Sequence, residues 1–437
     1  MTGEARQASR PRSIPARWWL ACVVAAAVAV ALGCRPPVQG EGWNVVLVTL
    51  ETTRADHLGA YGHDRATSPN LDALAGEGVL FENAISASPR TNPSLATLMT
   101  SLYPHGHGVR NLLLPLEPEH RTLAEVLRDA GYDTGAVQTH PRLVRGSGFE
   151  QGFRDYDDDV PAHPLAEDAV AKAVAWIDGK RGGSRPWFLW LHLMDPHWTY
   201  DPPEGWRTRF GPEHPLPSEI YRRLQAREMT IGPILYRNRM TPEEVGGFVD
   251  LYDAEIAYTD HALGRLVDRL RDSGDLDRTL FVVTADHGES LGENDYFFEH
   301  GAFGGEAEIH VPLILVAPGR LPAGTRVPAT VRTLDVAPTV TDLLGIEGGG
   351  AFRGFSLRPL VEGDADDRPG FGETGKVFHE ENAVREVEGL AGKWRWLRRG
   401  PFKLVHRPRA DGTAERVLYD VTAETGETVD VAARYPE

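Results

Sequence analysis

Cysteine is almost absent from this sequence, because 437 residues contain only Cys22 and Cys34. If the segment that holds Cys22 is removed, no disulfide within the chain is possible, and packing must supply the stability of the folded protein. The sequence also lacks an internal repeat and a long low-complexity run, which argues against repeat architectures. The chain is long enough for one large domain and a smaller one around a full hydrophobic core.

Positive charge is also scarce, since 46 Lys and Arg face 63 Asp and Glu, for a formal charge of −17. The first 40 residues hold five Arg and one Glu, a net of +4, so the remainder carries −17 − 4 = −21. An acidic body argues against nucleic acid as a partner. An anionic ester stays possible as a substrate, because a bound metal ion would set the local field.

A long apolar run is missing as well. The apolar stretch at residues 18–33 is shorter than the ~20 residues of a comfortable membrane span. Residues 1–17 before it carry four Arg and no Lys, a pattern typical of an export signal. Cys34 follows Ala31-Leu32-Gly33, which resembles a bacterial lipoprotein cleavage site. We expect an exported protein of the cell envelope, with a membrane tether at Cys34; an uncleaved signal anchor is the alternative.

From residue 42 onward, apolar runs alternate with amphipathic segments. Runs of β-branched residues predict buried strands, and helical spacing of apolar residues predicts helices. Their alternation indicates an α/β fold, with a mostly parallel sheet and helices on both faces. Strands are expected at 44–51, 79–87, 135–140, 186–195, 279–286 and 311–318, and helices at 68–78, 93–103, 122–131, 165–179 and 242–273.

The pattern divides the chain into three parts. We expect a signal or lipoprotein segment at 1–40, a main domain at 41–346 and a small C-terminal α+β subdomain at 347–437. Residues 205–241 have few apolar runs and several Pro and Arg, and are interpreted as an insertion near the site.

The C-terminal part is predicted to form β-strands. Residues 391–408 predict a β-hairpin around Arg399-Gly400-Pro401, and residues 417–421 predict one more strand.

Polar side chains gather where predicted strands end. Glu51 ends the first strand, Asp195 and His197 lie at the end of 186–195, and Asp286 and His287 lie at the end of 279–286. Open parallel sheets place their sites outside the carboxyl ends of strands. These acidic and imidazole groups should therefore meet at one edge of the sheet.

Thr91 adds a hydroxyl near the start of a predicted helix. Asn92 can cap that helix, and Pro93 suits its first position. Free backbone N–H groups and the positive helix end would face an anion bound at Thr91. Thr91 is therefore a plausible nucleophile.

Glu51, Asp286 and His287 offer carboxylate oxygens and one imidazole. This donor set suits Zn²⁺ or Mn²⁺, and Ca²⁺ or Mg²⁺ less well. A metal ion held there would lower the pKa of the Thr91 hydroxyl and polarise an ester.

Each of these residues could also have a purely structural role. Thr91 could be a capping hydroxyl, Glu51 a surface carboxylate, Asp286-His287-Gly288 a turn, and His197 a loop residue. For Asp253, Glu255 and Asp260 we favour the solvated face of a helix.

Several long motifs carry a family resemblance. The chain resembles the sulfatases over nearly all of 43–432. The matching segments, in family order, are NVVLVTLETTRADHLGAYG (44–62), RTNPSLATLMTSLYPHGHGVR (90–110), FLWLHLMDPHWTYDPP (188–203), LYDAEIAYTDHALGRLVDRL (251–270), TLFVVTADHGESLGE (279–293), HVPLILVAPG (310–319), TLDVAPTVTDLLGI (333–346) and LYDVTAETGETVDVA (418–432).

The resemblance implies an alkaline-phosphatase-like fold, one divalent metal ion (Zn, Mn, Ca or Mg) and an esterase site. Glu51, Asp286 and His287 match the metal ligands. Thr91 matches the nucleophile, which also touches the metal. His197 and His300 match residues that bind the ester group or protonate the leaving oxygen.

The departures from the family bear on the chemistry. Sulfatases usually carry C-x-P-S-R or S-x-P-S-R, whose first residue becomes formylglycine, whereas this chain has Thr91-Asn92-Pro93-Ser94-Leu95. Thr cannot yield that aldehyde, because its β-carbon bears a methyl group. Leu50-Glu51 replaces the usual Asp-Asp pair. Gln138-Thr139-His140 lacks the usual Lys, for which His140 is a weak substitute.

A ligand set of Glu, Thr, Asp and His is also seen in the related phosphoglycerol and phosphoethanolamine transferases. Those enzymes carry several membrane helices, so hydrolysis is the better expectation here. We expect a phosphoester hydrolase with a Thr nucleophile. A sulfuric ester hydrolase with unmodified Thr and a non-catalytic binding lipoprotein remain as alternatives. The expected partner is a small-molecule, glycan or lipid-headgroup ester.

Overall fold

The computed structural model describes residues 42–161, 165–212, 241–293, 296–347, 350, 352–364, 367–375, 392–409, 411–423 and 426–435. The expected signal segment at 1–40 and most of the expected insertion at 205–241 lie outside these residues. Among the helices of the described ranges, none combines the length and the apolar character that crossing a membrane requires.

The core of the molecule is a large, mostly parallel sheet, as predicted. Its strands run in the order β11-β2-β10-β6-β1-β5-β3-β4, and β9 pairs with β2. The central strand β1 is parallel to both β5 and β6, whereas β10 is antiparallel to its two neighbours. The strands are β1 Asn44–Leu50, β2 Val79–Ile85, β3 Asp133–Gln138, β4 Asp155–Asp157, β5 Trp187–Leu193, β6 Thr279–Ala285, β9 His310–Val311, β10 Leu313–Val316 and β11 Thr325–Arg332.

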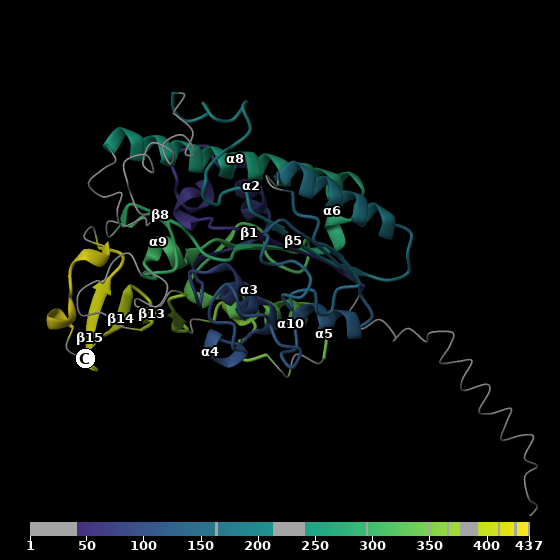
Figure 1. Ribbon diagram of the computed structural model, residues 1–437. Coiled ribbons are helices and arrows are strands. Elements are labelled where there is room, and N and C mark those ends of the chain that lie inside the picture. The colour runs from purple at the N-terminus through teal and green to yellow at the C-terminus, as the bar shows by residue number, and fades with distance from the viewer. Residues whose placement is uncertain are drawn as a thin grey trace, which may run out of the picture. The chain divides into compact units, whose positions relative to one another are not determined.

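Helices cover both faces of the sheet, as Figure 1 shows. The helices α2, α6 and α8 lie on one side of β1 and β5, and α3, α5 and α10 lie on the other. Strands β1, β5 and β6 are completely buried between these layers, which accounts for their apolar, β-branched composition. The helices are α2 Pro69–Glu77, α3 Thr91–Thr100, α4 Pro104–His107, α5 Leu123–Asp129, α6 Ala166–Lys180, α8 Pro242–Asp272, α9 Glu306–Ile309, α10 Val336–Leu343 and α11 Arg358–Val361.

The C-terminal part forms a separate antiparallel sheet of four strands, in the order β12-β13-β14-β15. The expected hairpin is confirmed, because β13 and β14 pair on either side of Gly400, whose φ is +51°. Trp396 and Val405 lie in a small apolar cluster that also includes Ile85 and Ile309 of the main domain. The strands are β12 Gly370–Glu373, β13 Arg395–Arg399, β14 Phe402–Pro408 and β15 Ala414–Asp420, and a two-stranded sheet joins β7 Ser290–Leu291 to β8 Phe297–Glu299.

The acidic residues of helix α8 do not form a solvated face, so our interpretation of them was wrong. Asp253, Glu255 and Asp260 are all buried. Asp260 accepts hydrogen bonds from the backbone N–H groups of Asn70 and Leu71, at 3.0 and 2.8 Å. Glu255 accepts from the backbone N–H of Asp201 at 2.7 Å, and Asp253 contacts two histidines. These partners lie far away in the sequence, and they compensate the cost of burying carboxylates.

Candidate active site

The candidate site lies where three adjacent parallel strands end. Glu51 follows β1, and Asp286 and His287 follow its neighbour β6. The backbone N–H of Glu51 donates to the carbonyl of Leu193, the last residue of β5, at 2.8 Å. Glu51, Asp286 and His287 are fully buried, and one potential ligand atom from each lies within 4.8 Å of the others. The structure therefore brings together the three residues that the sequence predicted.

The turn after Glu51 is held by Thr52 in an unusual backbone conformation. Thr52 has a φ of +47°, which a β-branched residue adopts only under strain. Its backbone N–H donates to Asp286 Oδ1 at 3.1 Å, and its hydroxyl donates to the Pro196 carbonyl at 2.8 Å. The Tyr252 hydroxyl donates to the Thr52 carbonyl at 2.7 Å. These three bonds fix the direction in which Glu51 points.

Thr91 lies beside this group at the start of helix α3. Its hydroxyl donates to Glu51 Oε1 at 2.6 Å. Thr91 is the first helical residue and Arg90 stands at the capping position without a side-chain cap, so our expectation that Asn92 caps the helix was wrong. Pro93 is tolerated inside the helix because the first turn needs no partner for its N–H.

Two serines, Ser94 of helix α3 and Ser86 just after strand β2, bind the carbonyl of Asp286. Ser94 donates from Oγ to the Asp286 carbonyl at 2.5 Å, and Ser86 donates to the same carbonyl at 2.6 Å. Because helix α3 is anchored there, Thr91 keeps its position relative to Glu51 and Asp286. Ser94 is therefore a positioning residue that the sequence analysis quoted without a role.

The donor set fits a divalent cation. Asp286 Oδ2 and His287 Nε2 are buried, and neither has a hydrogen-bond partner among the described residues. Burial and the nearby Glu51 raise the pKa of Asp286 well above its usual range. Burial raises the pKa of Glu51, but its contacts with His140, His192 and His287 outweigh burial and hold this pKa well below its usual range. Burial lowers the pKa of His287 to about 4, which leaves the neutral imidazole that a metal ion requires.

His197 and His300 lie on one side of this group. The His300 ring centroid is 4.3 Å from that of His287 and 5.4 Å from that of His197. His300 Nδ1 lies 3.0 Å from Glu289 Oε1, and His197 Nδ1 lies 2.5 Å from the Trp198 carbonyl. Both rings are thus oriented through Nδ1.

His192 is a site residue that the sequence analysis missed. Its Nε2 lies 2.8 Å from Glu51 Oε2, and its Nδ1 lies 2.8 Å from the Thr49 hydroxyl. A single imidazole inside the otherwise apolar strand Trp187–Leu193 was the available signal. Buried polar groups in such strands have a partner nearby, and here that partner is Glu51.

His140 does not replace the missing Lys of the family. Its ring centroid lies 6.3 Å from that of His197, so it stands close to the site. Burial lowers the pKa of His140 to about 3. The side chain is therefore uncharged at neutral pH and supplies no cation to the substrate.

Asp195 lies near the same strand end but serves helix α6. Its Oδ1 accepts from the Ala166 N–H, the first residue of that helix, at 2.9 Å. Its Oδ2 is buried without a hydrogen-bond partner in the described residues. Burial raises the pKa of Asp195 to about 7, so the ionised form is penalised in the folded protein.

We expect Asp195→Asn to stabilise the protein at alkaline pH. A carboxyl whose folded pKa lies above its unfolded value of ~3.9 contributes less stability as pH rises from about 4 to 7. Asn keeps the oxygen acceptor for Ala166 and carries no charge. Thermal unfolding should show a Tm above that of the parent at pH 8 and a smaller difference at pH 5. An equal change at both values would contradict this assignment of the pKa.

Comparison with known proteins identifies the family of this chain. The sulfatase family model matches residues 43–346. Arylsulfatase K of Rattus norvegicus is 26% identical, over 90% of this chain and 75% of its own length. The N-acetylglucosamine-6-O-sulfatase of Bacteroides thetaiotaomicron is 23% identical, over 88% of this chain and 81% of its own length.

Solved structures show the same fold. A protein in complex with its substrate D-glucosamine-2-N,6-O-disulfate superimposes with a TM-score of 0.73 at 21% identity, over 90% of this chain and 94% of the other. The phosphonate monoester hydrolase of Silicibacter pomeroyi has a TM-score of 0.69 at 25% identity, over 90% and 92% of the two chains. This chain therefore belongs to the sulfatase family of the alkaline phosphatase superfamily and is an ester hydrolase.

Proposed function

We propose that this protein is a metal-dependent phosphoester hydrolase that uses the unmodified Thr91 as its nucleophile. One observation carries the proposal: the Thr91 hydroxyl lies 2.6 Å from Glu51 Oε1, directly beside Asp286 and His287. A nucleophilic hydroxyl needs a neighbouring group that accepts its proton or lowers its pKa. Glu51 provides an acceptor at hydrogen-bond distance.

Glu51, Thr91, Asp286 and His287 are the residues that would hold one divalent cation. When bound, such a cation lowers the pKa of the hydroxyl and neutralises charge that develops on the ester oxygens. The donor chemistry of two carboxylates and one imidazole favours Zn²⁺ or Mn²⁺ over Ca²⁺ or Mg²⁺.

The protein's own groups account for the two halves of the reaction. Thr91 Oγ passes its proton to Glu51 and forms a bond to phosphorus, and the bond from phosphorus to the leaving oxygen breaks. His197 or His300, whose rings are oriented through Nδ1, gives a proton to that leaving oxygen. Water then attacks phosphorus and gives one proton to the histidine, and the bond from phosphorus to Thr91 Oγ breaks. Thr91 Oγ recovers its proton from Glu51, so that the hydroxyl is restored. The N-terminal end of helix α3, which begins at Thr91, favours the anionic group.

The identity of the nucleophile favours phosphorus over sulfur. A formylglycine can release its ester by breakdown of a hemiacetal, but Thr91 cannot, because its β-carbon carries a methyl group. The covalent intermediate must therefore be cleaved by water at the central atom. The similarity to a phosphonate monoester hydrolase supports phosphorus chemistry.

A sulfuric ester hydrolase is the second candidate. The names of both curated relatives describe sulfatases, and the same in-line attack by Thr91 can be written at sulfur. For either chemistry we propose a small-molecule, glycan or lipid-headgroup ester as the substrate.

We also propose that the protein is exported and tethered to the cell envelope through Cys34. Support comes from the sequence alone, in the basic and apolar segments that precede Cys34. Labelled fatty acid should be incorporated into the parent chain and not into Cys34→Ala. Equal labelling of both chains would exclude Cys34 as the anchor.

An assay of substrate classes tests the proposed chemistry. The purified protein would be offered an aryl sulfate, a phosphate monoester and a phosphate diester, with and without Mn²⁺, Zn²⁺ and Ca²⁺. We expect turnover of a phosphoester that depends on the added cation, with little release of sulfate. Preferential release of sulfate would contradict the choice of phosphorus and favour the second candidate.

A further inference from the structure

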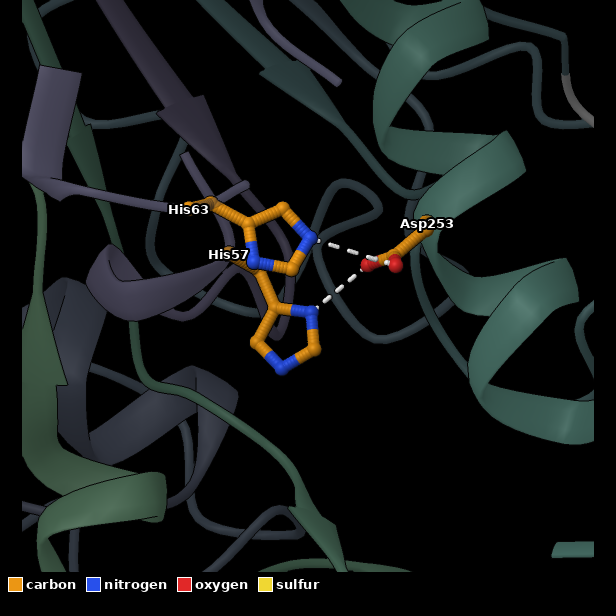
Figure 2. Close-up of side chains that lie close together, drawn as sticks. All are labelled: His57, His63 and Asp253. Carbon is orange, nitrogen blue, oxygen red and sulfur yellow. Dashed lines mark hydrogen bonds and ion pairs between the residues drawn. The ribbon is translucent and has the colours of Figure 1, made fainter. Parts of the chain in front are cut away.

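A second group of potential metal ligands lies apart from Thr91. It consists of His57, His63 and Asp253, which Figure 2 shows converging on one another. The two histidines belong to the segment after β1, at the end of a 3₁₀ helix (Ala55–His57) and just beyond the next one (Gly59–Tyr61). Asp253 projects from helix α8. Ligand atoms from the three side chains lie within 4.8 Å of one another.

Both imidazoles turn a nitrogen toward the same carboxylate. His57 Nδ1 lies 2.6 Å from Asp253 Oδ1, and His63 Nε2 lies 3.3 Å from Asp253 Oδ2. The ring centroids of the two histidines are 4.8 Å apart. The two contacts, one to each carboxylate oxygen of Asp253, are the dashed lines in Figure 2.

The group is sheltered and held in place by its surroundings. Asp253 is completely buried, His57 is buried and His63 is half-buried. The His57 carbonyl accepts from the Thr67 hydroxyl at 2.6 Å, and the Tyr252 ring packs edge-on against the His57 ring. The donors are thus positioned before any ligand arrives, while His63 leaves one side of the group accessible.

We propose that His57 Nδ1, His63 Nε2 and the Asp253 carboxylate bind a second divalent transition-metal ion, with Zn²⁺ as the best-suited ion. Two imidazoles and one carboxylate are a common Zn²⁺ donor set, and three protein ligands leave a fourth position for water. Ligand atoms at ~2.1 Å from a tetrahedral ion lie about 3.4 Å apart. The 3.3 Å separation of His63 Nε2 and Asp253 Oδ2 already matches this value.

His57 Nδ1 contacts the other oxygen of Asp253, at 2.6 Å, so the carboxylate must turn and this contact must open by about 1 Å for both nitrogens to share an ion with it. Binding also requires that His57 Nδ1 and His63 Nε2 carry no proton, so each ring adopts the tautomer with its hydrogen on the other nitrogen. Burial raises the pKa of Asp253, but hydrogen bonds from His57 and His63 outweigh burial and lower this pKa to about 2. The carboxylate is therefore ionised at neutral pH, as a metal ligand must be.

Arg65 is the cation that competes for this carboxylate. Its Nη1 lies 2.8 Å from Asp253 Oδ2 and also 2.8 Å from Asp250 Oδ1. Arg65 keeps Asp250 as a partner when Asp253 turns to an ion. Two carboxylates and one guanidinium leave a net negative charge, which favours a divalent cation. A bound ion would link helix α8 with the segment that follows Glu51.

Metal content in a defined background tests the proposal. The full chain carrying Glu51→Gln and Asp286→Asn, which removes both carboxylates of the first group, would be loaded with Zn²⁺, desalted and analysed by mass spectrometry. We expect about one retained equivalent, and none after His63→Ala is added. Loading with Co²⁺ should give the visible absorption bands of a tetrahedral ion only while His63 is present.

His261→Ala is the matched control, because His261 is an exposed histidine on the same helix as Asp253. It should leave the retained equivalent unchanged. The alternative is a hydrogen-bonded contact that binds no ion, for which His63→Ala lowers Tm equally with and without Zn²⁺. That result, or a background chain that retains no metal, would overturn the proposal. Since both carboxylates of the first group are removed throughout, the outcome does not depend on the proposed phosphoesterase activity.

Discussion

Replacing Thr91 by Ala should lower phosphoester turnover by at least about a thousandfold. The hydroxyl that forms the covalent ester is lost, and so is the 2.6 Å hydrogen bond to Glu51. Helix α3 should persist, because Ser94 still binds the Asp286 carbonyl and Ala favours helices. The measurement is kcat on the best phosphoester, together with Tm to confirm that the variant is folded.

Thr100→Ala provides the matched control. Thr100 lies at the other end of helix α3, where its hydroxyl donates to the Ala96 carbonyl rather than to the site. Its removal should change kcat by no more than about twofold. Thr91→Ser retains a hydroxyl and should keep part of the activity. A Thr91→Ala protein with the parent's turnover would refute the proposed nucleophile.

Replacing Asp286 by Asn should separate activity from stability. We expect turnover to fall by at least about a hundredfold, because Asn offers a neutral and weaker donor to a cation. In the metal-free protein the same change should raise Tm. Asp286 and Glu51 are both fully buried, and burial with the nearby Glu51 raises the pKa of Asp286 well above its usual range. Removal of one carboxylate relieves this repulsion.

Tm is measured for each protein with a chelator present and again in excess Zn²⁺, and the two values are compared. The parent protein should gain stability from Zn²⁺ and Asp286→Asn should gain less, since only ions bound to the folded state stabilise it. Asp277→Asn is the control, because Asp277 is exposed near the opposite end of strand β6. A Tm of metal-free Asp286→Asn below that of the parent would show that Asp286 stabilises the empty site, contrary to our expectation.

The sequence predicted the elements that depend on local patterns. The strand expected at 44–51 is observed at Asn44–Leu50, and the helix expected at 242–273 is observed at Pro242–Asp272. These segments can be predicted from apolar periodicity and capping residues, such as the capping box of Thr241 and Glu244. The start of helix α3 was missed by two residues, because the first turn makes no intrahelical N–H bond that would fix it.

The sequence also predicted that Glu51, Asp286 and His287 meet, because parallel strands present their carboxyl ends at one edge of a sheet. It did not predict the contact of His192 with Glu51. That contact depends on the register of β5 against β1, in which His192 stands opposite Thr49. Register is set by packing across the whole sheet rather than by the residues of one strand.

By itself, then, the sequence determined the α/β alternation and the meeting of Glu51, Asp286 and His287, since these depend on local pattern or on the common edge of parallel strands. Only the tertiary structure decided which polar groups are buried and which side chains they contact. Asp253 on helix α8 looked solvated by its spacing, yet it contacts His57, 196 positions earlier in the chain. A buried carboxylate is stable only when partners compensate its lost hydration, and those partners come from segments that folding alone brings together.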